Sequence, residues 1–272
     1  MRRAARWSLA VLILLCAVRP SPAGDDAEER GRDGVCGEIV SACSSAPVFI
    51  LGERHREASS HALFLEVVNA FVARGERVLV GLEIGSDRQP YLDAAIRGTG
   101  SPDAVARPPI DSPSYRELVH ALGGLARAPD SRVTVRAIDA PVGSSSDRDE
   151  EMAATVGAAL RSGSCDRVVA LVGNFHALKE VPAATGATDP RKRLAGLLSD
   201  RGVKVVSLVQ KFPGPCAGRA NATLFAAGDE TTATMVHGLW GALKTNPSCV
   251  EPATHAAVDG VVAWTCGDEP PR

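Results

Sequence analysis

The chain has 272 residues, of which 45% are apolar, and this is enough to form the buried core of an ordinary globular domain. Its 30 basic and 32 acidic residues give a net charge of −2, and removal of residues 1–23 leaves 26 basic residues and a net charge of −6. A surface that binds nucleic acid through its phosphates needs an excess of positive charge. The composition therefore argues against a nucleic-acid partner.

The first 23 residues have the pattern of a secretory signal peptide. Arg2, Arg3 and Arg6 precede an apolar run at 7–18, and Ser21-Pro22-Ala23 forms a small-x-small cleavage site before a polar segment. The apolar run is short for a membrane span, so an uncleaved anchor is the less favoured alternative. We expect an exported protein, periplasmic or secreted, with no membrane span after cleavage.

Cysteine usage predicts disulfides rather than metal thiolates, because an even number remains after cleavage and no CxxC pair is present. We expect the bridges to hold an N-terminal extension at 24–46 and a Cys-, Pro- and Gly-rich C-terminal extension at 211–272 against a core at 47–210. The pairing stays open. The six cysteines are Cys36, Cys43, Cys165, Cys216, Cys249 and Cys266.

Short apolar runs alternate with amphipathic segments through the core. The runs are rich in Val, Ile and Leu without strict alternation, which is typical of strands buried on both faces of a parallel sheet. Strands are predicted at 48–51, 78–83, 133–139, 168–173 and 203–209, with a further candidate at 258–266.

The segments between the predicted strands have helical spacing of apolar residues, at 64–72, 115–125 and 152–160. Asp189 and Pro190 indicate the N-cap and first turn of another helix that runs to Leu198. Strands alternating with helices imply βαβ units with right-handed crossovers. The sequence therefore predicts an α/β fold with a mostly parallel central sheet flanked by helices.

Polar side chains follow four of these strands, and ligands of open α/β sheets bind beyond the carboxyl ends of the strands. Taken singly, each is an ordinary turn, cap or surface residue. Their recurrence at one structural position predicts a shared site, and Gly52 is expected to let the chain turn at the end of the first strand. The residues are Glu53, His55, Glu83, Asp139, Asn174 and His176.

Arg148 lies between Asp147 and Asp149 at the start of the helix after the third strand. One interpretation is that the two aspartates cap the helix and Arg148 points to solvent. The other is that Arg148 pairs with a strand-end carboxylate or binds an anionic transition state. The sequence contains no glycine-rich phosphate loop, no GxSxG elbow and no HExxH helix, so it does not favour the enzymes that use these motifs.

Four segments in order resemble the ChaN-like haem-binding-uptake group, which belongs with the TIKI/TraB metalloproteases and the erythromycin esterases. They are GExH at 52–55 with a second histidine six residues later, GLEIGSDRQPYLDAAI at 81–96, DRDEEMA at 147–153 and LVGNFHA at 171–177. The resemblance covers roughly residues 46 to 210. It implies that one pocket gathers Glu53, His55, Glu83, Arg148 and His176.

The resemblance implies two functions. The first is an exported hydrolase of a small-molecule or peptide substrate, in which His55 or Glu53 acts as general base and Arg148 stabilises negative charge. His55, Glu83 and His176 would hold a divalent metal or orient the base, with Asp139 and Asn174 as further pocket residues.

The alternative is a non-enzymatic haem- or iron-binding protein of an uptake system, with a homodimer as one arrangement. Haem would need an axial ligand such as Tyr91 or Tyr115, or else His61 or His120, both of which we expect on exposed helix faces. A third interpretation is a disulfide-stapled interaction domain whose polar strand ends have no chemical role.

Overall fold

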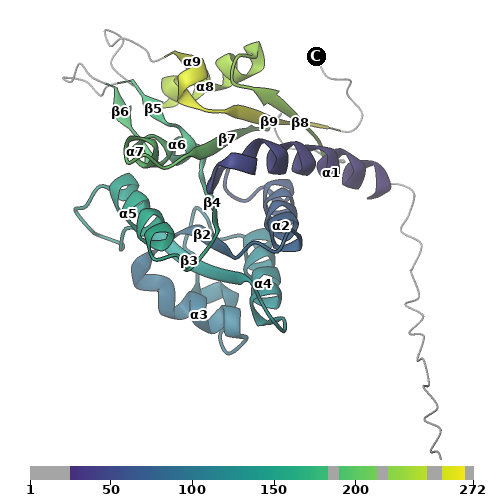
Figure 1. Ribbon diagram of the computed structural model, residues 1–272, viewed down its shortest axis with the longest axis vertical. Helices are drawn as coiled ribbons and strands as arrows, with labels where there is room; N and C mark the ends of the chain where they lie inside the picture. Colours follow the sequence, from purple (N-terminus) through teal and green to yellow (C-terminus); the bar gives the residue numbers. More distant parts are fainter. Residues whose placement is uncertain (1–24, 183–189, 213–219, 244–252, 267–272) are drawn as a thin grey trace, which may run out of the picture.

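The computed structural model describes residues 25–182, 190–212, 220–243 and 253–266. Within them a seven-stranded sheet is covered by helices on both faces (Figure 1). All its strands run parallel except β8, which pairs antiparallel with β9 at one edge. In spatial order they are β3 (Val133–Asp139), β2 (Val78–Gly85), β4 (Arg167–Gly173), β1 (Val48–Glu53), β7 (Val205–Lys211), β9 (Gly260–Cys266) and β8 (Ala220–Ala226).

Two apolar cores lie on opposite faces of the sheet, because alternate strand residues point to opposite sides. Phe49 and Leu51 of β1 belong to one core, while Val48 and Ile50 belong to the other. The helices of the first core are α1 (Asp25–Ala42), α2 (Ala58–Ala73), α3 (Gln89–Arg97) and α4 (Pro113–Arg127). Those of the second are α5 (Arg148–Arg161), α7 (Leu194–Asp200), α8 (Glu230–Ala242) and the short α9 (Thr254–Ala257).

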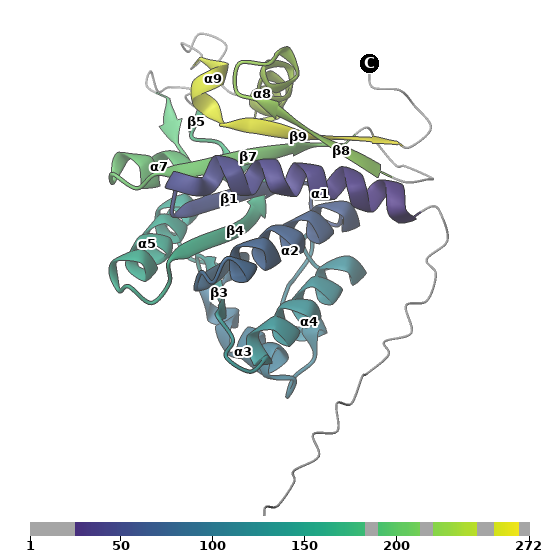
Figure 2. The ribbon, with the colours of Figure 1, turned by 45° about the vertical axis from the view of Figure 1, so that its right-hand side comes forward.

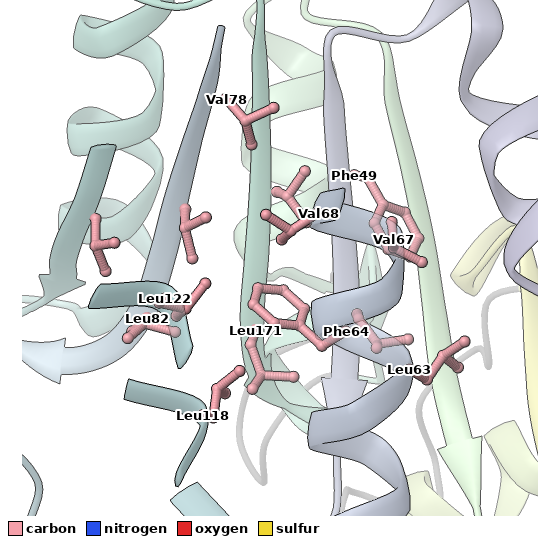
Figure 3. Packing of buried hydrophobic residues seen from close by; sticks show 14 of the residues in the cluster. Phe49, Leu63, Phe64, Val67, Val68, Val78, Leu82, Leu118, Leu122 and Leu171 are labelled. Carbon is pink, nitrogen blue, oxygen red and sulfur yellow. The ribbon is translucent and has the colours of Figure 1, made fainter. Parts of the chain in front are cut away.

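The first core shows how the predicted apolar side of α2 packs on the sheet. Phe64, Val67 and Val68 lie on one side of α2, and Figure 3 shows them packed over side chains of the strands, among them Leu171 of β4. All of these side chains are fully or almost fully buried. The expected α/β fold with a mostly parallel sheet and flanking helices is confirmed. No helix in the described parts of the chain is long and apolar enough to cross a membrane.

The predicted strand boundaries lie within two residues of the observed ones, but the predicted helix start at Asp189 and Pro190 is wrong. Asp189 lies outside the described residues, and Arg191–Lys192 forms a short strand, β6, that pairs with β5 (Glu180–Val181). Helix α7 begins only at Leu194, whose backbone N–H donates to Asp149 Oδ1 at 3.1 Å. A carboxylate from another helix therefore satisfies this N-terminus, and local sequence could not reveal it.

The N-terminal extension is not stapled through Cys43, contrary to the disulfide prediction. Cys43 and Cys165 are free thiols, whereas Cys266 is disulfide-bonded. Burial raises the pKa of Cys43 to about 12 despite the opposing charge of Arg167. The predicted signal peptide, Cys216 and Cys249 lie outside the described residues.

Helix packing and one arginine hold the N-terminal segment against the sheet. Helix α1 packs against α2 and β8 (Figure 2). Arg167, buried at the start of β4, donates to the backbone carbonyls of Cys43, at 3.0 Å, and of Ala46, and it pairs with Glu76 at 2.5 Å. A buried cation that satisfies three acceptors links this segment to the sheet.

Gly52 has a different role from the predicted turn, because it lies inside β1. A β-carbon there would lie 2.7 Å from Asn174 Oδ1 and 2.8 Å from the Ala177 Cβ, in the short helix α6 (Asn174–Ala177). The absence of a side chain lets α6 approach the sheet closely.

We predict that Gly52→Ala lowers the free energy of unfolding by about 1–3 kcal/mol, the usual cost of overpacking a close contact. Gly124→Ala is the matched control, because Gly124 is exposed on α4 with nothing near its would-be β-carbon. That change should raise the free energy of unfolding by about 0.5–1 kcal/mol through helix propensity. Urea unfolding followed by circular dichroism measures both, and equal effects would contradict the close contact.

Candidate functional site

Glu83 lies at the centre of the predicted site, at the carboxyl end of β2. The pairing of β2 with β3 shifts register between Leu82 and Gly85, and such irregularities redirect side chains near sites. The buried carboxylate accepts the Gly173 N–H at 2.5 Å through Oε2, and Oε1 lies 2.5 Å from Arg148 Nη2. Glu83 thus connects the ends of β2 and β4 with the start of α5.

Glu53 holds two imidazoles at the end of β1. Its Oε1 lies 2.8 Å from His55 Nδ1, and its Oε2 lies 2.9 Å from His61 Nε2. Burial alone would raise the pKa of Glu53, but the hydrogen bonds from the two histidines lower it below its ordinary value. Glu53 is therefore a carboxylate that accepts from both rings, which leaves Nε2 of His55 as the unprotonated nitrogen in the neutral ring.

The pKa of His55 is raised although partial burial opposes this, because its hydrogen bond to Glu53 and the charges of Glu53 and Glu83 favour the imidazolium. Its Nε2 lies 3.3 Å from the point that a β-carbon on Gly173 would occupy, and Glu83 Oε2 lies 3.4 Å from the same point. His55 and Glu83 therefore meet over Gly173. Arg56 follows with φ 79°, a strained left-handed conformation of the kind that collects at functional sites.

A second imidazole–carboxylate pair lies on the other side of Glu83. His176 Nδ1 lies 2.8 Å from Asp149 Oδ1, and His176 Nε2 lies 3.5 Å from Glu83 Oε1. Arg193 also pairs with Asp149 at 3.0 Å. Burial alone would raise the pKa of Asp149, but its contacts with His176 and Arg193 lower it.

Arg148 pairs with strand-end carboxylates, as the second interpretation of its position predicted. Its Nε lies 2.9 Å from Asp139 Oδ1, and its Nη2 lies 2.6 Å from Asp139 Oδ2 as well as close to Glu83. Hydrogen bonding to Asp139 raises the pKa of Arg148. Asp147 caps α5, as the first interpretation expected, but Arg148 pairs with carboxylates and does not simply point to solvent. Within the described residues Nη1 of Arg148 has no hydrogen-bond partner, and the side chain is 49% exposed.

Asn174 serves mainly to join α6 to β7. Its amide donates to the Gln210 carbonyl at 2.9 Å, and its Oδ1 accepts the Gln210 N–H at 2.8 Å. The five main predicted residues, Glu53, His55, Glu83, Arg148 and His176, do gather at the ends of neighbouring strands, whereas the Asn174 amide is occupied by backbone.

Two contributors to this site were not predicted from the sequence. His61 was expected on an exposed helix face, and instead it is buried against Tyr115 with ring centroids 5.5 Å apart. Asp149 was considered only as a helix cap, although it orients His176. Helical spacing could have found His61, because it lies one turn before Phe64 and Leu65 on α2.

The metal prediction does not fit the arrangement. Within the described residues no group of three or more His, Cys, Asp or Glu side chains is placed to hold a metal ion. The reason is that Arg148 occupies the carboxylates of Glu83 and Asp139, while Glu53 and Asp149 take up one nitrogen each of His55 and His176.

The sequence-predicted haem ligands also fit poorly. Tyr115 is fully buried, and burial raises its pKa well above the ordinary range, so the phenol stays protonated. His61 Nε2 is held by Glu53. Tyr91 lies under the guanidinium of Arg88, 4.5 Å from the ring centroid, and His120 lies exposed on α4. None of these side chains is presented by the cavities that surround His55.

Comparisons with known proteins show the fold. No protein-family model and no curated protein matches the chain. Among solved structures, a mutant of the erythromycin esterase EreC in its open conformation matches with a TM-score of 0.54 and 12% identity, over 85% of this chain and 92% of that one. ChaN of Campylobacter jejuni, described with cofacial haem, matches with a TM-score of 0.46 and 12% identity over 86% and 91% of the two chains.

The type III effector HopBA1 matches with a TM-score of 0.48 and 14% identity, over 93% of this chain and 98% of that one. The resemblance predicted from the sequence motifs is thus confirmed at the level of the fold, through the esterase. Sequence identities this low transfer no activity, so the chemistry has to be argued from the residues of this chain.

We predict that His61→Leu lowers the free energy of unfolding at pH 7 by about 1–3 kcal/mol, because the buried carboxylate of Glu53 loses a donor. His120→Leu is the control, since exposed positions tolerate substitution within about 0.5 kcal/mol. The Glu53 pKa is lowered in the fold, so its stabilisation is present above the unfolded pKa and is lost as pH falls through the folded pKa. Urea unfolding at neutral and acidic pH should show the variant's deficit shrinking in acid, and a constant deficit would contradict this pairing.

Proposed function

We propose that the chain is a hydrolase of esters or amides that uses His55 as general base. The observation that carries this proposal is the orientation of His55: the buried carboxylate of Glu53 holds Nδ1 at 2.8 Å, and the ring lines the cavities at the strand ends. An imidazole held through Nδ1 by a carboxylate presents a basic Nε2 to water, which is the arrangement that general-base catalysis requires.

The reaction follows from this geometry. His55 Nε2 removes a proton from a water molecule as the water oxygen bonds to the substrate carbonyl carbon, and the carbonyl oxygen becomes negatively charged. The tetrahedral intermediate then collapses, the bond to the leaving group breaks, and the leaving group takes the proton from the imidazolium. Glu53 is a positioning residue, because it stabilises the imidazolium without touching the substrate.

Arg148 and His176 support the charge that develops. Nη1 of Arg148 is available to the oxyanion, while its other nitrogens are fixed by Asp139 and Glu83. A fixed cationic donor aimed at an oxyanion is among the largest contributions to catalysis. His176, held by Asp149, keeps its Nε2 beside Glu83 and so helps to position the carboxylate that holds Arg148.

The erythromycin esterase shares the fold only. We propose a small molecule or a peptide as the substrate, with the carbonyl group at His55, which lines both strand-end cavities. The alternative, a haem- or iron-binding protein, would use the same strand-end residues without a reaction. A homodimer remains part of that alternative. No step of the proposed mechanism requires a metal or haem.

We predict that His55→Ala lowers kcat by about 10²–10⁴-fold on a panel of chromogenic esters, which is the usual contribution of a general base. Only the neutral ring acts as base, so kcat should rise as pH increases through a His55 pKa that is above the ordinary value. Glu53→Gln removes the charge that raises this pKa, so the rise should move to lower pH while the plateau falls.

His120→Ala is the matched control, because it removes an exposed histidine from α4. Turnover that survives His55→Ala, or a pH profile that Glu53→Gln does not move, would contradict the proposal. A Soret band on haem titration that His55→Ala abolishes, together with no hydrolysis, would instead support the haem-binding alternative.

We also propose that the chain is exported, on the evidence of the signal-like pattern at 1–23. Expression of the full chain in a secretion-competent bacterial host should yield mature protein in the periplasm or medium that begins at Gly24. N-terminal sequencing tests this, and replacing the apolar run at 7–18 with a polar one provides the control. Full-length protein retained inside the cell would contradict export.

A further inference from the structure

Two cavities meet at the proposed general base. The first has a volume of about 340 Å³ and extends from the ends of β2 and β3 toward the segment at 105–110. The second has a volume of about 400 Å³ and lies between the ends of β1 and β7 and helix α8. His55 lines both cavities, and no other described residue does so. A substrate whose carbonyl group lies at His55 can therefore extend into both cavities.

The first cavity carries excess positive charge. Its acidic residues are Glu83 and Asp139, and both are already paired with Arg148. Two further arginines, Arg88 and Arg107, also line it. The lining therefore has three arginines against two carboxylates, and neither carboxylate pairs with Arg88 or Arg107. This surplus of one positive charge favours an anionic group.

The environments of the two arginines support that conclusion. Arg88 is fixed by donating to the backbone carbonyls of Ala104 and Val105 and by stacking on Tyr91. Neutral acceptors hold its guanidinium in place without cancelling its charge. Arg107 is exposed, and its side chain has no hydrogen-bond or ion-pair partner within the described residues. It is therefore available to a ligand.

The second cavity has an apolar wall, formed by Phe175, Phe212, Met235 and Leu239. Its polar floor is already occupied by internal hydrogen bonds. Gln210 donates to the Gly52 carbonyl at 2.8 Å and to Ser60 Oγ at 2.6 Å, and its own Oε1 accepts from Trp264 at 2.8 Å.

Asn174 and Glu53, the other polar groups of that floor, are likewise engaged, by β7 backbone and by the two imidazoles. A ligand in this cavity finds few unpaired polar atoms apart from His55 and the exposed cations Arg54 and Lys211 at its margin. Burial of apolar surface is therefore the main source of affinity available here.

We propose that the substrate is an ester of an apolar acyl group with an alcohol or phenol that bears a carboxylate or phosphate. The acyl group lies in the second cavity, the anionic group lies near Arg88 and Arg107, and the ester carbonyl lies at His55. This inference rests on the hydrolase function proposed above. Water adds across the ester C–O bond, so one carboxylic acid and one anionic alcohol or phenol are released.

The test compares three esters: 4-(octanoyloxy)benzoate, which has both features, phenyl octanoate, which lacks the anion, and 4-acetoxybenzoate, which lacks the long acyl group. The wild-type protein should give the highest kcat/KM with the first. The value should be about tenfold above that for phenyl octanoate, the loss expected for one hydrogen bond to a charged group. It should be at least about tenfold above that for 4-acetoxybenzoate, which loses the apolar burial of the long acyl chain. Equal kcat/KM values for the three esters would overturn the proposal.

Two substitutions assign the two halves of the substrate to the two cavities. Arg107→Gln should raise KM for 4-(octanoyloxy)benzoate about tenfold with little change in kcat, and should leave phenyl octanoate unaffected. Leu239→Ser should raise KM for both octanoyl esters but not for 4-acetoxybenzoate. Arg97→Gln, at an exposed arginine on α3 outside both cavities, is the matched control.

A binding measurement separates failure of this inference from failure of the hydrolase proposal. The ether 4-(octyloxy)benzoate cannot be hydrolysed, and isothermal titration should show that it binds the wild-type protein about tenfold more tightly than it binds Arg107→Gln. Binding with this dependence but no ester hydrolysis would overturn the hydrolase and keep the ligand class. Hydrolysis that depends on His55, with no preference for the anionic ester, would overturn the ligand class and keep the hydrolase.

Discussion

The pairing of buried carboxylates is the constraint on which the strand-end site depends. Removing a carboxylate from water is costly unless cations or hydrogen-bond donors replace the lost hydration. Four carboxylates are buried at the ends of β1, β2 and β3 and in the first turn of α5, and each has such partners. They are Glu53 with His55 and His61, Glu83 with Arg148 and the Gly173 N–H, Asp139 with Arg148, and Asp149 with His176 and Arg193.

This pairing also orients the chemistry. Because Glu53 fixes His55 through Nδ1, Nε2 is the nitrogen left for chemistry on a residue that lines both cavities. Arg148 is held between two carboxylates, so its free nitrogen has a defined position. The interactions that make burial tolerable therefore also supply the preorganisation that a hydrolytic site requires. A variant that breaks one pair should consequently alter both stability and the site.

The sequence predicted the central part of the fold well, for a physical reason. Strands buried on both faces must be apolar throughout, so the runs at β1 and β4 are visible without any alignment. The carboxyl ends of parallel strands lie at one edge of the sheet, which makes it predictable that Glu53 and Glu83 lie at the same edge. Elements that depend on long-range partners were harder to predict. Helix α7 starts where Asp149 caps it, and β8 is an edge strand whose pairing with β9 has no local signal.

The N-terminal segment shows the same limitation. Its glycine and cysteine content suggested an extension held by disulfides, whereas Val35, Ile39 and Cys43 lie at helical spacing and are buried. The spacing of these residues indicates a helix, but the cysteine content favoured the disulfide interpretation. His61 was misplaced for a related reason, because a histidine on a helix is usually exposed. Its spacing from Phe64 and Leu65 indicates the buried side of α2, but its pairing with Glu53 is visible only in the structure.

The three histidines near the site differ in which nitrogen remains accessible, and this distinguishes their roles. His61 gives Nε2 to Glu53, and its Nδ1 is buried with no partner among the residues that the structure describes, so the ring positions the carboxylate. His176 gives Nδ1 to Asp149 and keeps Nε2 beside Glu83. His55 alone, within the described residues, combines a carboxylate on Nδ1 with a place on the walls of both cavities. A general base needs an oriented ring and an accessible lone pair together, and of these three histidines only His55 joins an oriented ring to a place on the cavity walls.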